Sequence, residues 1–352
     1  RLFQLGGVLA AALLLRMDMV FFVGISILFL APWLLKNRNA ALKFLLITGL
    51  PMALYMLFRW FYFGDIFPNT YYLKLYQIPL DFRFERAWFH FKEWAKPLWL
   101  IGLLIPLMMI PLRKSKSMWM AFVLICTYLL YNLYVGGDAW EESGVGANRF
   151  TTIVIPWVFI IFAAGGYAWG KMIQGKVGAF VRILLPALAC LLVFVLVNGI
   201  LFVAGMKKNR DRFMVTTAPY NTDYQMWNVM KAYDLNRELG VGNRTAVVQA
   251  GDLGYFAECE LVDVLGYNDR YISKLPPYWD LRSTPVEAYI PGHAKLDYRH
   301  VIVDLQPDVV MDVWRRYSPA VSNELDSLLV AHHYEKRPQG GWKKIGFKRH
   351  TK

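Results

Sequence analysis

The chain has 352 residues, of which 56% are hydrophobic and only 18% are charged, whereas a soluble domain carries about 25% charged residues. This composition excludes an ordinary soluble enzyme as a description of the whole chain. The net charge of +13 does not indicate nucleic-acid binding, because the surplus lies in the apolar part: 18 Lys and Arg against 8 Asp and Glu up to Met206, but 21 against 18 beyond it. Topology explains a surplus placed in membrane loops.

The composition changes near Met206, and this change divides the chain into two expected domains. Residues 1–206 alternate apolar runs with short polar breaks and should form a membrane domain, and residues 207–352 should form a soluble domain. The chain begins at Arg1 without an initiator Met, and the apolar run that follows lacks the n-region and cleavage site of a signal peptide. We therefore expect earlier membrane segments to precede this sequence.

Several apolar runs approach or reach the length of about 17–25 residues that a membrane-spanning helix needs. They are Met19–Leu35, Ala41–Tyr62, Pro97–Leu112, Met118–Val135, Thr151–Gly170 and Ile183–Gly205. Leu2–Leu15 is one more, shorter candidate. The expected membrane domain is thus polytopic and α-helical, with about six to seven spans by this length criterion.

The polar breaks between these runs are of two kinds. Lys36–Lys43, Arg113–Ser117 and Lys171–Arg182 each contain three Lys or Arg and no acidic residue, and short basic loops stay in the cytoplasm. They alternate with Phe63–Lys96 and Gly136–Phe150, which contain acidic and aromatic residues. Every span therefore agrees on one orientation. In a bacterium it makes the chain a multi-pass inner-membrane protein whose acidic segments and C-terminal domain are extracytoplasmic.

Charged residues also occur within or beside the apolar runs. Arg16 and Asp18 interrupt apolar sequence at the outer end of the first pair of runs. Charges near membrane depth usually pair with each other or face a cavity, and they mark functional sites by default; a tight turn at the interface explains them equally well. Arg59 lies near the outer end of its span and should extend to the membrane surface.

The C-terminal domain alternates helical and strand patterns, which predicts a small α/β domain. The expected elements are a helix at Thr222–Leu239, strands at Thr245–Ala250, Glu260–Val264 and Trp342–Phe347, and a helix or strand at each of Tyr298–Leu305 and Pro307–Val313. The turn Gly251–Gly254 would allow a ligand to approach closely, but it lacks the full dinucleotide-binding fingerprint.

The two acidic outer segments contain the residues best suited to chemistry. The first provides Asp65, Asn69, Tyr71, Tyr72 and Lys74, and the second provides Asp138, Trp140, Glu141, Glu142 and Arg149. Gly136 and Gly137 would let the chain turn tightly and hold Asp138 near the membrane surface. Each segment thus combines carboxylates, aromatic rings and a cation at the point where the backbone leaves the membrane.

This mixture of residue types is suited to transfer of a sugar from a lipid phosphate. Aromatic rings stack on sugars and carboxylates accept hydrogen bonds from sugar hydroxyls, while Arg149 or Lys74 could stabilise the charge that develops on the phosphate. A carboxylate, Asp138 or Glu141, could take the proton of an acceptor hydroxyl. Phosphate leaves without protonation, so one base suffices, unlike the two carboxyls of a glycoside hydrolase. An interfacial loop with solvated charges would give the same pattern.

The sequence resembles the polyprenyl-phosphate-dependent GT-C glycosyltransferases, and among them the bacterial terminal arabinofuranosyltransferase-like membrane enzymes. The segments that carry the resemblance are Asp65 with Pro68–Lys74, Val135–Asp138 with Arg149, Phe150 and Pro156, the Gly251–Gly254 turn, Val262–Asp269, and Leu14–Asp18, which is similar to an Arg-Pro-Asp element with Met17 in place of the proline.

The resemblance implies an inverting transfer from a polyprenyl-phosphate sugar to a glycan, lipid or protein acceptor outside the cytoplasm, in cell-envelope assembly. It also points to Asp252, Asn268 and Asp269 as binding residues, and it places a further base in an outer loop before this sequence. Paired acids could hold a divalent cation, but no ligand spacing marks a metal site. A non-catalytic transporter or envelope-assembly scaffold is the alternative. The sequence does not separate arabinosyl, mannosyl and aminoarabinosyl transfer.

Overall fold

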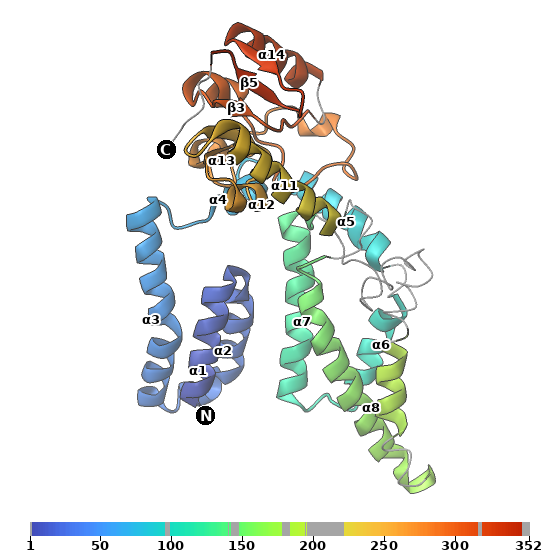
Figure 1. Ribbon diagram of the computed structural model, residues 1–352. Helices are drawn as coiled ribbons and strands as arrows, with labels where there is room; N and C mark the ends of the chain where they lie inside the picture. The colour runs from blue at the N-terminus through green and yellow to red at the C-terminus, as the bar shows by residue number, and fades with distance from the viewer. Residues whose placement is uncertain are drawn as a thin grey trace. The chain divides into compact units, whose positions relative to one another are not determined.

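The computed structural model describes residues 2–95, 99–139, 141, 148–177, 184–193, 195, 222–315 and 319–346 (Figure 1). The chain divides into two compact units. Unit 1 comprises Arg1–Pro68 and Ala87–Val203, and unit 2 comprises Asn69–Arg86 and Ala204–Lys352. The division therefore differs from a single boundary near Met206, because an internal segment of the apolar half belongs with the C-terminal unit.

Unit 1 consists of helices. They are α1 (Leu2–Leu15), η1 (Met17–Met19), α2 (Val20–Leu34), α3 (Arg38–Phe63), α6 (Trp99–Met109), α7 (Lys116–Val135), η4 (Thr152–Val154) and α8 (Ile155–Val177), with the last part of α5 (Leu80–Ala95). A further apolar helix covers Leu184–Val193.

Four helices among the described residues are long and apolar enough to cross a membrane. They cover Met17–Leu34, Arg38–Phe63, Lys116–Val135 and Thr152–Met172. The expected span at Pro97–Leu112 contains the shorter helix α6, and the one at Ile183–Gly205 lies partly outside the described residues. Large apolar side chains such as Leu28 and Phe61 are 70% and 81% exposed. A helix that is apolar all round suits a membrane span, so the chain is a membrane protein.

Two clusters of buried side chains hold unit 1 together. Residues of α2, α6, α7 and α8 form one cluster, and residues of α1, α2 and α3 form the other. At the contact of α1 with α3, Thr48 Oγ1 donates a hydrogen bond of 3.4 Å to the carbonyl oxygen of Gly6. A Cβ at Gly6 would lie 3.1 Å from that hydroxyl. Small residues allow such close approach between membrane helices.

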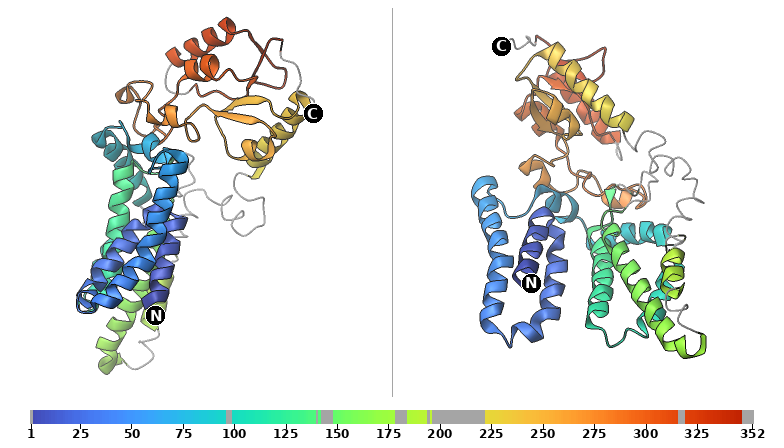
Figure 2. Two further views of the ribbon diagram at one scale, coloured as in Figure 1. Left: turned by 90° about the vertical axis from the view of Figure 1, so that its left-hand side faces the viewer. Right: turned by 60° about the horizontal axis from the view of Figure 1, so that its bottom comes forward.

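Unit 2 is built on a five-stranded sheet, as the alternating pattern predicts (Figure 2). Its strands are β1 (Arg244–Val247), β2 (Glu260–Asp263), β3 (Val309–Val310), β4 (Tyr334–Lys336) and β5 (Trp342–Lys344), in the order β2-β1-β3-β5-β4. β1 pairs in parallel with β2 and β3, whereas β5 pairs antiparallel with β3 and β4. Of the two ambiguous segments, Tyr298–Leu305 contains a helix and Pro307–Val313 contains β3.

Helices cover both faces of the sheet. In the left view of Figure 2 the sheet lies between α14 (Pro319–Ala331) and α11 (Thr222–Leu239). α11 and α12 (Asp252–Phe256) pack on one face, whereas α13 (Arg270–Lys274), η6 (His300–Asp304) and α14 pack on the other. Both faces are therefore buried, and the parallel strands consist mainly of apolar residues.

The segment 69–86 is an integral part of unit 2. It contains α4 (Asn69–Leu75) and the beginning of α5, whose Phe82 packs in a buried cluster with Tyr289. Arg86 is fully buried, and its Nε donates a 3.1 Å hydrogen bond to the carbonyl oxygen of Tyr289. Because a buried guanidinium needs hydrogen-bond acceptors, this contact fixes the segment in the unit.

Candidate functional site

The candidate site in unit 1 begins where α7 ends. Gly136 and Gly137 have φ angles of 87° and 80°, in the left-handed region that glycine adopts without steric cost. The amide of Gly137 donates a 2.9 Å hydrogen bond to the carbonyl oxygen of Asn132 and thereby closes the helix end. The predicted tight turn is confirmed, and it brings Asp138 directly beside the end of the helix.

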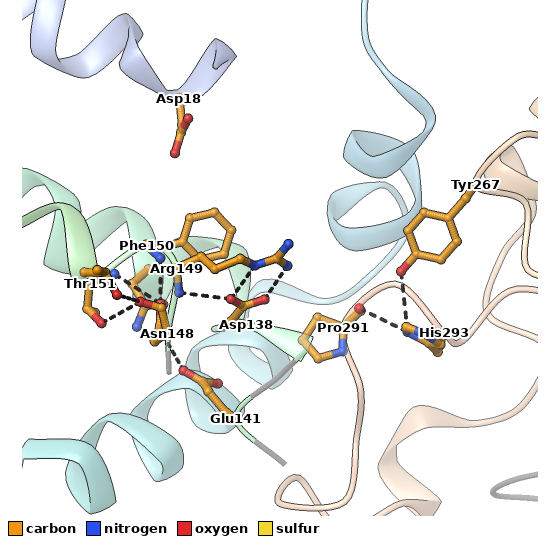
Figure 3. Close-up of polar contacts among 12 residues, drawn as sticks. Asp18, Asp138, Glu141, Asn148, Arg149, Phe150, Thr151, Tyr267, Pro291 and His293 are labelled. Carbon is orange, nitrogen blue, oxygen red and sulfur yellow. Dashed lines mark hydrogen bonds and ion pairs between the residues drawn. The ribbon is translucent and has the colours of Figure 1, made fainter. Parts of the chain in front are cut away.

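Asp138 and Arg149 form the central ion pair of this site (Figure 3). Arg149 Nε lies 2.8 Å from Asp138 Oδ2 and Arg149 Nη2 lies 2.6 Å from Oδ1, and the amide of Arg149 donates a further 3.0 Å bond to Oδ2. The Asp138 side chain is 0% exposed, whereas that of Arg149 is 54% exposed. The carboxylate thus lies inside the protein and the guanidinium extends outward, in the two-pronged geometry typical of strong Arg–carboxylate pairs.

Asn148 organises the return of the chain towards α8. Its Oδ1 accepts hydrogen bonds from the amides of Phe150 and Thr151, at 2.8 and 3.1 Å, as a helix cap does. Its Nδ2 donates to Asn132 Oδ1 at 2.7 Å and also to Glu141 Oε1. Asn148 therefore connects α7, α8 and Glu141. The sequence contains the signal for this cap, an Asn just before an apolar helix, but the candidate residues did not include it.

A buried amide on α7 completes this polar network. Asn132 is 0% exposed, and among the described residues its Nδ2 has no hydrogen-bond partner. Its Oδ1 accepts the hydrogen bond from Asn148, so Asn132 joins α7 to the polar network of this site.

The first outer segment divides between the two units. Asp65, in unit 1, accepts a hydrogen bond from the amide of Phe67, and Arg59 Nε donates to the carbonyl oxygen of Ile66 at 2.8 Å. These contacts order the chain after α3, where Gly64 has a φ of 67°. The expected extension of Arg59 to the membrane surface stays a prediction.

The remaining candidates of that segment lie in unit 2. Asn69 Nδ2 donates to the carbonyl oxygen of Tyr267 at 3.1 Å, and the Nζ of Lys274 lies 4.6 Å from the centre of the Tyr72 ring. Tyr71 is exposed and Lys74 is partly buried. Asn69 and Tyr72 therefore help to pack the segment into unit 2, while Tyr71 presents an aromatic ring to the outside.

A buried lysine fixes the same segment. Lys295 is 0% exposed, and its Nζ donates to the carbonyl oxygens of Tyr72 and Ser273 at 2.9 and 3.0 Å. Burial lowers the pKa of Lys295 to about 8, because the charged form loses its hydration. No local pattern indicates this contact, because it joins residues 223 positions apart.

The candidate residues of the soluble domain lie at or beside the starts of two short helices. Asp269 caps α13 by accepting a 2.9 Å hydrogen bond from the amide of Ile272, and Asn268 is exposed. Asp252 is the first residue of α12. A Cβ at Gly254 would lie 2.1 Å from Leu261 Cδ1. At this glycine, therefore, α12 approaches the sheet closely, and the close approach of a ligand is not needed to explain it.

The carboxylate at the end of β2 was not among the candidates. Asp263 is buried and accepts hydrogen bonds from the amides of Leu265 and Asn268, at 2.9 and 2.7 Å. Burial raises the pKa of its carboxyl group, although these bonds oppose the shift. Its role is to hold the turn that follows β2.

His293 was also missed and forms a partly buried aromatic cluster in unit 2. Its ring lies 5.0 Å from that of Trp314, and Nδ1 lies 3.5 Å from the hydroxyl of Tyr267 and 3.4 Å from the carbonyl oxygen of Pro291 (Figure 3). Burial lowers the pKa of His293 to about 4. A lone His gave no sequence signal, because its neighbours come from distant segments.

Some predictions concern residues beyond this description. Trp140 and Glu142 lie outside the described residues. Within the described part of the chain, no group of three or more His, Cys, Asp or Glu is arranged to hold a metal ion. The divalent cation therefore stays a prediction.

Comparison with protein-family models, with curated proteins and with solved structures finds no match. The fold and the site by themselves define a class: a helical membrane protein with an α/β unit and an Arg–carboxylate pair at the end of a membrane-spanning helix.

Proposed function

We propose that the chain is a glycosyltransferase that moves a sugar from a polyprenyl-phosphate donor to a glycan, lipid or protein acceptor at the outer face of a bacterial inner membrane. The observation that carries the proposal is the Asp138–Arg149 pair: a half-exposed guanidinium held by a buried carboxylate at the end of a span. A lipid phosphate lies at the membrane interface, where such a cation meets it. The alternation of basic and acidic loops supports the outward orientation.

Arg149 acts on the leaving group in this reaction. The acceptor oxygen attacks the anomeric carbon of the sugar, the bond from that carbon to the phosphate oxygen breaks, and the phosphate leaves with the bonding electrons as polyprenyl phosphate. The configuration at the carbon inverts. Negative charge accumulates on the phosphate as the bond breaks, and a preorganised guanidinium stabilises it without reorganisation. Asp138 positions Arg149, since both of its oxygens accept hydrogen bonds from that residue.

The acceptor proton goes to a carboxylate. Within the described site we assign this role to Glu141, which is partly buried and held by Asn148 through Oε1. Asp138 is less suitable, because it is fully buried behind Arg149.

The test is transfer by the full chain in proteoliposomes. Polyprenyl-phosphate donors with labelled arabinofuranose, mannose or aminoarabinose are supplied with a membrane extract as acceptor, and labelled product is measured. Arg149→Gln should lower transfer by about 100-fold or more, as removal of one transition-state donor does. Arg113→Gln is the matched control: it removes a positive charge from an exposed position in a basic loop and should leave transfer unchanged.

Two results would reject the proposal. Transfer at the wild-type rate by Arg149→Gln would remove the site assignment. Uptake or efflux of sugar by the proteoliposomes, with no transfer product from any donor, would identify a transporter instead.

A further inference from the structure

Arg16 and Asp18, in the turn between α1 and α2, form a second ion pair of the same design as Asp138–Arg149. Arg16 Nε lies 3.0 Å from Asp18 Oδ1, and Arg16 Nη2 lies 2.7 Å from Oδ2. The side chain of Asp18 is 9% exposed and that of Arg16 is 44% exposed. In both pairs a carboxylate less exposed than its partner binds Nε and Nη2 of a guanidinium that is about half exposed. A guanidinium has five N–H donors, so this pairing leaves donors of Arg16 directed away from Asp18.

Aromatic side chains connect the two pairs within unit 1. The ring of Phe21, just after Asp18, lies 4.8 Å from that of Tyr131, which in turn lies 5.5 Å from the ring of Phe150, next to Arg149. In Figure 3 the Asp18 carboxylate is on the side of the cluster where Phe150 and Arg149 lie. Both pairs are therefore at the same end of the helices, with aromatic rings between them.

The Arg16–Asp18 turn also contacts α7. The hydroxyl of Tyr128 donates a 3.3 Å hydrogen bond to the carbonyl oxygen of Asp18. Tyr128 precedes the end of α7 at Val135 by about 10 Å of helix, at about 1.5 Å per residue. The turn between α1 and α2 is therefore held against the last part of the helix that leads to Asp138.

We propose that Arg16 is a second phosphate-binding residue, which binds the phosphate of a membrane lipid at the same end of unit 1 as Arg149. This inference rests on the proposed function and identifies the anchor of the donor. The rings of Phe21 and Tyr131, which lie beside the pair, suit a phosphate attached to a lipid chain better than a free anion. Asp18 is a positioning residue that acts through Arg16, as Asp138 acts through Arg149.

The experiment measures binding of polyprenyl monophosphate to the full chain in nanodiscs of a zwitterionic lipid, by native mass spectrometry. Arg16→Gln should weaken binding about 10- to 100-fold, the effect of losing hydrogen bonds to a charged group. Arg16→Lys keeps the positive charge but lacks the planar arrangement of N–H donors of a guanidinium, so its loss of binding affinity should be smaller. Arg113→Gln, with the same change of charge in a basic loop, should bind within about twofold of wild type.

Unchanged binding by both Arg16 variants would overturn the proposal. Competition arms identify the ligand: displacement by inorganic phosphate at equal concentration would show a free-anion site, and displacement by phosphatidylglycerol would show an ordinary anionic-lipid site, and either result overturns the assignment. Thermal unfolding of each variant checks that it folds. If Arg16→Gln does not fold, the binding affinity of Arg16→Lys tests the proposal instead.

The two proposals fail separately. A wild-type chain that binds polyprenyl phosphate through Arg16 but transfers no sugar would reject only the proposed function. A chain that transfers sugar and whose Arg16→Gln variant binds the lipid normally would reject only the second phosphate contact.

Discussion

The substitution Asp138→Asn separates a positioning role for this residue from a role as the catalytic base. An amide of the same shape keeps one acceptor oxygen but places an NH2 group against the guanidinium of Arg149, where two donors then face each other. In the wild-type structure Asp138 accepts three hydrogen bonds from Arg149, of 2.8, 2.6 and 3.0 Å. The variant therefore loses the ion pair and at least one hydrogen bond, while the backbone of the Gly136–Gly137 turn is unchanged.

The size of the effect follows from the exposure of the two partners. Hydrogen bonds to charged groups contribute about 1.5–3 kcal/mol, and removing one partner of a fully buried pair costs about 3–5 kcal/mol. Arg149 is 54% exposed, so water can replace part of what it loses. We expect a loss of about 1.5–3 kcal/mol. If transfer needs Arg149 in its paired position, the rate falls about 10- to 100-fold, at about 1.4 kcal/mol per factor of ten.

The assay is a double-mutant cycle on the transfer rate at saturating donor. If Asp138 acts only through Arg149, Asp138→Asn should have little further effect in the Arg149→Gln background. Additive losses, with disappearance of the acidic limb of the pH–rate profile in Asp138→Asn alone, would show that Asp138 itself takes the proton. Such a result would refute the positioning argument and restore Asp138 as the base.

Three further predictions concern the turn and unit 2, each measured by thermal unfolding or hydrogen exchange of the full chain. Gly137→Ala, at a φ of 80°, should destabilise the end of α7 by about 1–2 kcal/mol. Wild type should lose stability as the pH falls from about 6.5 to about 4, because over this range His293 is protonated in the unfolded chain but neutral in the folded protein. His293→Gln should flatten this dependence of stability on pH, whereas His332→Gln should leave it unchanged. Wild type should gain stability relative to Lys295→Met as the pH rises from about 8 to about 10. Over this range Lys295 is neutral in the folded protein and still protonated in the unfolded chain. A difference in stability between the two proteins that does not change with pH would contradict this prediction.

Local patterns predicted the helices and the turn correctly because the forces that set them are local. Continuous apolar runs identify α2, α3, α7 and α8, since a membrane helix satisfies its own backbone hydrogen bonds. Consecutive glycines predicted the left-handed turn after α7, where other residues would be strained. Alternation of strand and helix patterns predicted the α/β character of unit 2.

Contacts between distant segments were not predictable in this way. By contrast, the cap of α13 by Asp269 is a local contact whose N-cap signal is present in the sequence; the binding role expected for Asp269 stays a prediction. The segment 69–86 was assigned to the membrane half by its position in the chain, although buried contacts such as that of Arg86 place it in unit 2.

The sequence by itself determined that this is a membrane protein with an α/β unit, and it identified Asp138 and Arg149 as candidates, because composition and periodicity report on burial in lipid and in a core. Only the tertiary structure decided which atoms meet: that Asp138 lies buried behind Arg149, that Arg16 and Asp18 repeat this arrangement, and that Lys295 secures a segment 223 positions away. The physical reason is that a buried charge needs a partner. Tertiary packing decides which residue is that partner, and the local sequence around the charge does not indicate it.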